Sequence, residues 1–257
     1  MHINELFDLS GKTAIVTGGG RGLGEQIAAS LAEAGANVVV CSRKLEACKE
    51  VSDRLIEKGI ESLALQCDVT NPDQVNEVVE KTIDRFGKID ILFNNSGATW
   101  AAPVVEMPLE AWQKVLNVNA TGTFLMSQAV GKVMIEQKSG KIINIASVAG
   151  LGGADPRHMD TIGYNTSKGA VITFTKDLAT KWGEHNINVN AIAPGFFPTK
   201  MSKGLLEQNG DQILSRTPLK RYGKDYELKG AALFLAAKAS DYVTGEILVV
   251  DGGTNAQ

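Results

Sequence analysis

The chain has 257 residues, 44% of them hydrophobic and 21% charged, and a formal net charge of −3. This length allows one large α/β domain, and the weak net charge gives no sign of a nucleic-acid or anionic-membrane partner. The sequence has three cysteines without a CxxC pattern and three scattered histidines, and it has no apolar run near ~20 residues. These features predict a soluble, cytoplasmic protein with no metal site and no membrane span.

The first predicted unit is a strand, a glycine-rich turn and a helix. Residues 12–17 are short and β-branched like a buried strand, and Ile27 and Leu31 begin an apolar helical spacing that stops at Gly35. The glycines between them follow the pattern T-G-x-x-x-G-x-G and fit G-x-G-x-x-G in no register. Bare backbone amides at a helix N-terminus can receive a pyrophosphate, so this unit predicts the first half of a dinucleotide-binding fold. A glycine-rich loop without a ligand is the alternative.

The second predicted strand, residues 37–41, indicates which nicotinamide cofactor would bind. An acidic residue about 20 positions after the glycines binds the ribose 2′-hydroxyl of NAD, whereas arginine suits the 2′-phosphate of NADP. Ser42, Arg43 and Lys44 follow this strand, and Arg21 lies in the glycine turn. The planar guanidinium of Arg43 favours NADP(H). Alternatively, Arg43 and Lys44 only begin an exposed helix.

Strands and helices continue to alternate along the chain. Further strands are predicted at residues 63–67, 89–93, 140–146, 187–193 and 247–250, with helices ending at Lys58, Phe86 and Ala237 and two helical patterns that meet near Asn117 within residues 109–137. Alternation at this spacing predicts a doubly wound parallel sheet with helices on both faces. A ligand would bind beyond the carboxyl ends of the strands, where Gly18, Arg43, Asp68 and Asn95 fall. No linker interrupts the pattern, so we expect residues 1–257 to form a single domain.

Tyr164 and Lys168 open a helical pattern that runs towards Trp182. Residues four apart lie on one helix face, and an ammonium beside a phenol favours its ionised form. This pairing would move the phenol pKa from ~10 towards the range of a proton donor. Ser147 follows the predicted strand 140–146, and its hydroxyl could stabilise an alkoxide. Taken alone, such residues are more often an exposed pair and a turn serine.

Together, these motifs resemble those of the short-chain dehydrogenase/reductase family over nearly the whole chain. The resemblance rests on Thr17-Gly18-x-x-x-Gly22-x-Gly24, Asn94-Asn95-Ser96-Gly97, Tyr164-x-x-x-Lys168 and Asp251-Gly-Gly253, in this order. One departure is Ser96, where the family usually has alanine. The overall pattern is most similar to gluconate 5-dehydrogenases and 3-oxoacyl-acyl-carrier-protein reductases.

The resemblance implies a seven-stranded Rossmann fold and NADP(H)-dependent hydride transfer between the nicotinamide and a carbonyl or secondary alcohol. It implies that Tyr164 gives the proton, Ser147 orients the substrate oxygen and Lys168 also binds the nicotinamide ribose. Asn119, with Asn117 as a neighbouring candidate, would hold a water that relays protons from Lys168. The implied cofactor-binding residues are Gly18, Gly20, Arg21, Gly22, Leu23, Ser42, Arg43, Asp68, Val69, Asn95, Ser96, Gly97, Tyr164, Lys168, Pro194, Gly195, Phe197 and Thr199. A homotetramer is also expected by resemblance.

Two segments are expected near the substrate. Residues 148–163 look longer than the family's usual pattern and would lie over the substrate. Residues 200–224 are polar and poorly periodic, typical of a mobile lid at about residues 197–224. Their lysines could attract an acidic substrate such as a sugar acid or an acyl carrier, or form a solvated surface. An NAD-dependent sugar or polyol dehydrogenase and a catalytically silent NADP-sensing protein are the alternative functions.

Overall fold

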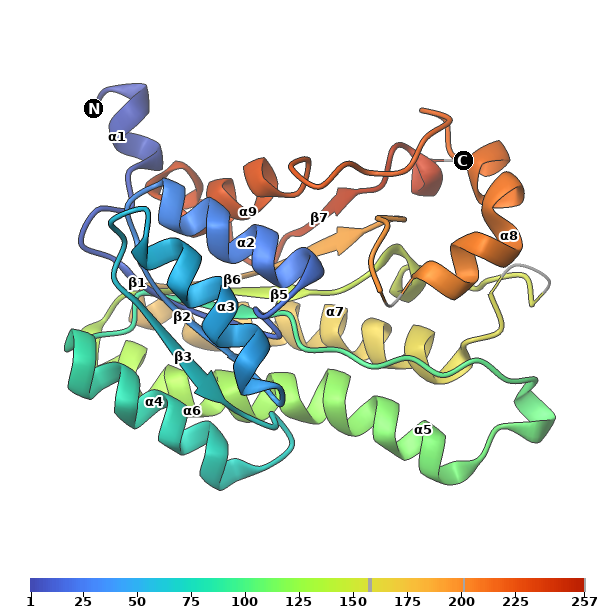
Figure 1. Cartoon of the computed structure of the whole chain (residues 1–257), viewed down its shortest axis with the longest axis horizontal. Helices are drawn as coiled ribbons and strands as arrows, with labels where there is room; N and C mark the ends of the chain where they lie inside the picture. Colours follow the sequence, from blue (N-terminus) through green and yellow to red (C-terminus); the bar gives the residue numbers. More distant parts are fainter. Residues whose placement is uncertain (157–158, 201, 257) are drawn as a thin grey trace.

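The computed structural model describes residues 1–156, 159–200 and 202–256. Within these residues, the strands form one seven-stranded parallel sheet in the order β3-β2-β1-β4-β5-β6-β7 (Figure 1). The strands are β1 Thr13–Thr17, β2 Asn37–Ser42, β3 Ser62–Gln66, β4 Ile91–Asn94, β5 Gly140–Ile145, β6 Ile187–Pro194 and β7 Ile247–Val250. The doubly wound sheet expected from the sequence is confirmed, and its strand order reverses between β1 and β4.

Helices cover both faces of the sheet. In Figure 1, α2 and α9 lie above the sheet, α3 passes in front of it, and α4, α5, α6 and α7 lie below it. Buried residues of α2, α3 and α9 belong to the same hydrophobic core. Their bounds are α2 Gly22–Glu33, α3 Leu45–Ile56, α4 Pro72–Phe86, α5 Leu109–Leu116, α6 Gly122–Gln137, α7 Ile162–Trp182 and α9 Lys229–Ala236. Val16 and Phe93 pack in one hydrophobic core, whereas Ile15 and Leu92, their neighbours along β1 and β4, pack in another. Successive side chains of a strand point to opposite faces of the sheet. Because both faces are buried here, uninterrupted runs of apolar residues are favoured in the strands.

Helix α4 begins and ends where its sequence predicts. Asn71 Oδ1 accepts hydrogen bonds from the backbone N–H groups of Asp73 (2.9 Å) and Gln74 (3.2 Å). Pro72 occupies the first helical position, and Gly87 follows the last turn in the left-handed region with φ 75°. Because these signals are local, both bounds can be read from the sequence without knowledge of the tertiary structure.

The structure departs from expectation within residues 200–224. This segment contains helix α8 Lys203–Arg216, whose backbone leaves the helical region at Asn209 (φ −123°, ψ 16°). Of the described side chains of α8, only Ile213 is buried. A kinked helix with so little buried surface has no clear apolar period, which is why the pattern missed it. The short helix α1 Ile3–Phe7 was also not expected.

Elsewhere, the predicted strand bounds differ from the observed ones by no more than two residues. Among the described residues, none of the helices has the length and apolar composition that a membrane crossing would require.

Candidate active site

The residues expected to bind the cofactor gather at one edge of the sheet. Apart from Tyr164 and Lys168 on α7, each lies at or just after the carboxyl end of a strand: Gly18, Gly20, Arg21, Gly22 and Leu23 after β1, Ser42 and Arg43 at β2, Asp68 and Val69 after β3, Asn95, Ser96 and Gly97 after β4, and Pro194, Gly195, Phe197 and Thr199 at β6. Parallel strands place these ends side by side, as the sequence predicted.

The turn between β1 and α2, residues 18–24, is tied by hydrogen bonds to the end of β4. Thr17 Oγ1 accepts hydrogen bonds from the backbone N–H groups of Asn95 and Ser96, each at 3.0 Å. In return, Asn95 Nδ2 donates to the carbonyl oxygens of Thr17 (3.0 Å) and Gly18 (3.2 Å). Thr17 and Asn95 therefore hold this glycine turn in the crevice where the strand order reverses.

The glycine turn leaves a helix N-terminus open to a ligand. Gly18 and Gly22 have positive φ angles of 63° and 57°, and a Cβ at Gly24 would collide with the carbonyl oxygen of Gly18 and the amide of Asn95. Arg21, the residue before α2, makes no side-chain capping hydrogen bond. The first amides of α2 therefore lack a side-chain cap, and together with the helix dipole they fit the pyrophosphate of a dinucleotide.

The end of β2 offers a guanidinium instead of a carboxylate. Arg43 is exposed, and its carbonyl oxygen accepts a hydrogen bond from Gln66 Nε2 at 3.4 Å. Asp68 is engaged elsewhere, because its Oδ1 accepts hydrogen bonds from the backbone N–H (3.0 Å) and the hydroxyl (2.8 Å) of Thr70. Ser42 ends β2 beside Arg43. A hydroxyl and a guanidinium at this position fit a ribose 2′-phosphate.

Strand β5 and helix α7 bring Ser147, Tyr164 and Lys168 together. Ser147 follows β5 and hydrogen-bonds with the Tyr164 phenol, while Lys168 Nζ lies 5.7 Å from the centre of the Tyr164 ring. The ammonium of Lys168 donates to the carbonyl oxygen of Ile145 at 2.6 Å, and the residue is 4% exposed. A Cβ at Gly150 would lie 2.5 Å from the backbone of Lys168, so glycine there lets the turn after Ser147 lie directly against α7.

Burial controls the pKa values of this pair. It raises the pKa of the Tyr164 phenol above its ordinary value of 10.0, and the hydrogen bond with Ser147 partly reverses that rise. Burial also lowers the pKa of Lys168 from 10.5 to about 8. The expected decrease in the phenol pKa is therefore wrong: the cost of charging a buried phenol outweighs the influence of an ammonium bound to a carbonyl. A phenol that stays protonated at neutral pH can still give its proton to an oxygen that gains negative charge.

Asn119 faces inward from a π-helical turn, Asn117–Thr121, between α5 and α6. It is 1% exposed, whereas Asn117 is exposed, so Asn119 is the asparagine that reaches the site. Its Oδ1 accepts from the backbone N–H of Ala98 at 2.7 Å, and its Nδ2 donates to the carbonyl oxygen of Ala98 (2.9 Å) and to Ser167 Oγ (2.8 Å). Both amide protons are thus used within the protein, and a relay water at this side chain would bind through its oxygen. Ser167 was not among the residues expected at the site.

The turn after β6 lies over the glycine turn. Thr199 Cγ2 lies 3.6 Å from the position that a Cβ at Gly22 would take. Ser202, which the sequence analysis also missed, fixes this turn: its hydroxyl donates to the carbonyl oxygen of Phe197 at 2.6 Å and accepts from the backbone N–H of Thr199 at 2.9 Å. A Thr and a Ser three residues apart are a local turn signal that could have been found.

The loop after β4 lies beside the segment between Ser147 and Tyr164. The backbone N–H of Ala102 donates to the carbonyl oxygen of Asp160 at 3.0 Å. The apolar side chains of these segments that are partly open to solvent include Trp100 (45% exposed) and Leu151 (36%). Residues 157–158 of the longer segment, where a substrate contact was expected, lie outside the described residues.

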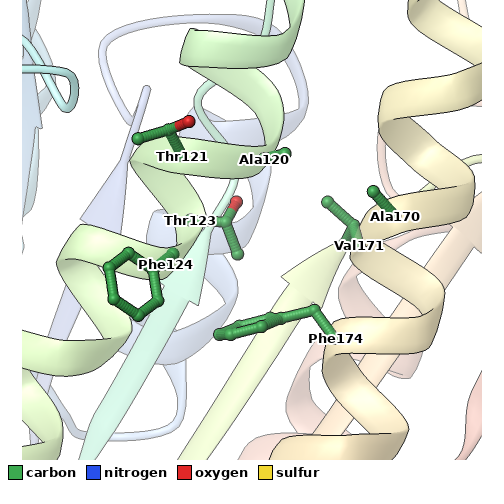
Figure 2. A pocket seen from close by; sticks show the side chains of 7 residues that line it. All are labelled: Ala120, Thr121, Thr123, Phe124, Ala170, Val171 and Phe174. Carbon is green, nitrogen blue, oxygen red and sulfur yellow. The ribbon is translucent and has the colours of Figure 1, made fainter.

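A pocket of about 330 Å³ lies between α7 and the helical stretch that carries Asn119 (Figure 2). Its lining residues are Ala120, Thr121, Thr123, Phe124, Ala170, Val171 and Phe174. Figure 2 shows the two phenylalanine rings pointing towards one another across it, with ring centres 6.5 Å apart in an edge-to-face arrangement. Phe124 is 44% exposed, so this pocket presents an apolar aromatic surface to solvent.

Comparisons with known proteins agree with this geometry. Residues 18–255 match a family model described as Enoyl-(Acyl carrier protein) reductase. The chain is 40% identical over 253 residues to 5-keto-D-gluconate 5-reductase of Escherichia coli, covering 98% of both chains. It is 42% identical over 247 residues to a 3-oxoacyl-[acyl-carrier-protein] reductase of Synechocystis sp., covering 95% of this chain and 97% of that one. A crystal structure of a gluconate 5-dehydrogenase from Burkholderia cenocepacia in complex with NADP and tartrate superposes with a TM-score of 0.94 at 37% identity, covering 100% of both chains.

Proposed function

The chain belongs to the short-chain dehydrogenase/reductase family and is an oxidoreductase acting on hydroxyl or keto groups, and we propose that it transfers a hydride between NADP(H) and a keto sugar acid. The observation that carries the proposal is a protonated phenol, Tyr164, hydrogen-bonded to Ser147 and one helical turn from a buried lysine. A proton donor, an oxygen-orienting hydroxyl and a nearby cation are what carbonyl reduction requires of a protein.

These side chains have different tasks in reduction. NADPH, when bound, supplies the hydride to the carbonyl carbon. Ser147 donates a hydrogen bond to the carbonyl oxygen, and Tyr164 gives that oxygen its proton as negative charge develops. Lys168 would bind the ribose hydroxyls of the cofactor through its ammonium, and its positive charge stabilises the phenolate that Tyr164 becomes after it gives up its proton. In alcohol oxidation the roles reverse, and the phenolate form of Tyr164 accepts the proton of the alcohol.

Two features of the chain support NADP(H) as the cofactor. Arg43 is exposed at the end of β2, and no carboxylate follows that strand directly. The Burkholderia relative was crystallised with NADP. An NAD-dependent sugar or polyol dehydrogenase would instead be expected to present an acidic side chain near Arg43.

The relatives support a keto sugar acid first and a 3-oxoacyl thioester second. A 5-keto-D-gluconate reductase and gluconate 5-dehydrogenases are similar over nearly the full chain, and so is a 3-oxoacyl-[acyl-carrier-protein] reductase. We place the substrate beside Trp100 and Leu151, with residues 197–224, including α8, as its lid. The whole chain, residues 1–257, then acts as one catalytic domain.

The decisive experiment follows NADPH absorbance with 5-keto-D-gluconate, a 3-oxoacyl thioester and a simple diketone. We expect turnover of the sugar acid by the wild type and a loss of about 10²-fold or more in Tyr164→Phe, because the proton donor is gone. Cofactor affinity should change little in that variant, as measured by quenching of protein fluorescence. Cofactor binding without turnover of any ketone would favour a silent NADP sensor instead.

We also propose that the protein is a homotetramer in which the Phe124 and Phe174 pocket packs against a second copy. The partly exposed aromatic surface between α6 and α7 would gain cover from such a contact.

A further inference from the structure

Ser167 lies between Tyr164 and Lys168 and joins two buried hydrogen bonds that the proposed chemistry leaves unexplained. Its hydroxyl donates to the carbonyl oxygen of Tyr164 at 2.7 Å and accepts from Asn119 Nδ2 at 2.8 Å. The residue is 0% exposed and Asn119 is 1% exposed, so water does not compete for either bond. The phenol-bearing residue is thereby connected to the π-helical turn.

The same connection continues to the cofactor crevice. Asn119 makes a two-point contact with the backbone of Ala98, which directly follows Gly97 at the end of the β4 loop. One line of hydrogen bonds therefore runs from Ala98 through Asn119 and Ser167 to the first turn of α7. In a π-helical turn each backbone hydrogen bond spans one residue more than in an α-helix. Such turns are frequent at functional sites, where they reorient side chains.

A serine inside a helix often bonds to a preceding carbonyl without any further role. Thr180, later in α7, is such a case: its exposed hydroxyl donates to the carbonyl oxygen of Lys176 at 3.0 Å and makes no other hydrogen bond in the described residues. Ser167 differs because its oxygen also satisfies a proton of a buried amide. Removal of the hydroxyl would leave that proton of Asn119 without its partner, and a buried unpaired donor is costly enough to move the groups around it.

We propose that Ser167 is a positioning residue for the proton donor. By linking Asn119 to the carbonyl of Tyr164, its hydroxyl fixes the first turn of α7 against the β4 loop and holds the phenol where Ser147 and the substrate oxygen meet it. This inference rests on the proposed function for its catalytic consequence. The chain of hydrogen bonds from Ala98 through Asn119 and Ser167 to Tyr164 is itself independent of any reaction.

The test compares Ser167→Ala with Ser127→Ala, a matched control. Ser127, on α6, is also a buried serine that accepts a hydrogen bond from a buried asparagine, Asn94 Nδ2, at 2.9 Å, but it does not contact Tyr164 or Lys168 through any described hydrogen bond. The readouts are kcat, KM and the solvent deuterium isotope effect on kcat. The isotope effect reports proton transfer and does not depend on the fraction of folded enzyme, so a merely structural defect leaves it unchanged.

For Ser167→Ala we expect kcat to fall about tenfold with KM within about twofold, and the solvent isotope effect to rise because proton transfer becomes slower. Ser167→Thr, which keeps a hydroxyl, should recover most of the loss. For Ser127→Ala we expect no change in the isotope effect. Equal isotope effects in the two alanine variants and the wild type would overturn the proposal.

Hydrogen exchange separates this inference from the proposed function. In Ser167→Ala, amides of residues 162–168 and 95–98 should exchange faster than in Ser127→Ala, because the link between them is cut. If exchange in both regions stays at the wild-type rate, the positioning role is refuted, whether or not a ketone is turned over. If the wild type reduces no ketone while Ser167→Ala shows the faster exchange, the proposed function is refuted. The positioning role of Ser167 between α7 and the β4 loop is then still supported.

Discussion

At the scale of single residues, the environment of Lys168 predicts the pH dependence. Burial lowers the pKa of Lys168 to about 8, so the ammonium is present below that pH and is lost as the pH rises through it. Because the proposed role requires the charged form, kcat/KM for NADPH should fall above about pH 8, well below the pH at which an ordinary lysine titrates. A pH profile of the initial rate measures this.

The control for this pH dependence is Lys141→Met. Burial also lowers the pKa of Lys141, but this lysine lies near the start of β5 and pairs with Asp241 at 2.8 Å. Replacement of Lys141 should leave the decrease in kcat/KM above about pH 8 unchanged. A rate that stays constant up to about pH 10 would contradict a requirement for charged Lys168 with this pKa.

Arg43 carries the prediction about cofactor choice. Arg43→Ala should weaken NADPH binding by about 1–3 kcal/mol and change NADH binding little, because a bidentate guanidinium contact serves only the 2′-phosphate. Titration of both cofactors by fluorescence measures the two affinities. Lys49→Ala is the control, since Lys49 is a cation on the following helix α3 that pairs with Glu46 at 3.1 Å. Equal losses for NADPH and NADH in Arg43→Ala would refute the phosphate contact.

Residue types and spacings revealed the pair Tyr164 and Lys168, but not the direction of the phenol pKa. Spacing fixes which side chains share a helix face, whereas the depth of burial depends on the packing of the turn at Gly150 against α7. Ser167 was missed for the same reason: its partner Asn119 lies 48 residues away in the chain. Local patterns carry no information about such contacts.

At the scale of elements, the turn between β1 and α2 depends on glycine at position 24. Gly24→Ala should destabilise the protein by about 1–3 kcal/mol and weaken cofactor binding, because the new methyl group meets the carbonyl of Gly18 and the amide of Asn95. Chemical denaturation measures the free energy of unfolding. Gly230→Ala, in α9 with no atom within 4 Å of the new Cβ, should instead gain about 0.5–1 kcal/mol. Equal effects of the two changes would contradict this account.

The helix with local boundary signals was predictable, and the helix without an apolar period was not. Helix α4 has a capping asparagine, a proline at its first position and a terminal glycine, so its bounds agree with the sequence. Helix α8 buries only Ile213 of its described side chains and is interrupted at Asn209, so its sequence carries no apolar period. A segment with so little buried surface is also suited to open and close over a substrate.

At the scale of the whole molecule, the strand order decides where chemistry can occur. The chain builds β1, β2 and β3 outward and then returns to place β4 beside β1, so the loops after β1 and β4 diverge and leave a crevice. The tight turn formed by residues 18–24 lies on one side of this crevice, and Ser147 and helix α7 lie on the other. The alternation of strands and helices was sufficient to predict this edge, because parallel strands admit few topologies.

The outer surface of α6 and α7 predicts the oligomeric state. Phe124 is 44% exposed beside Phe174, and a second copy of the chain would cover both rings. Phe124→Glu should therefore dissociate the proposed tetramer into smaller species, because a carboxylate buried without a partner costs several kcal/mol. Light scattering coupled to size exclusion measures the mass, and Ile56→Glu, an exposed position on α3 at 51%, is the control that should leave it unchanged. A Phe124→Glu variant with the mass of the wild type would show that this surface is not a subunit contact.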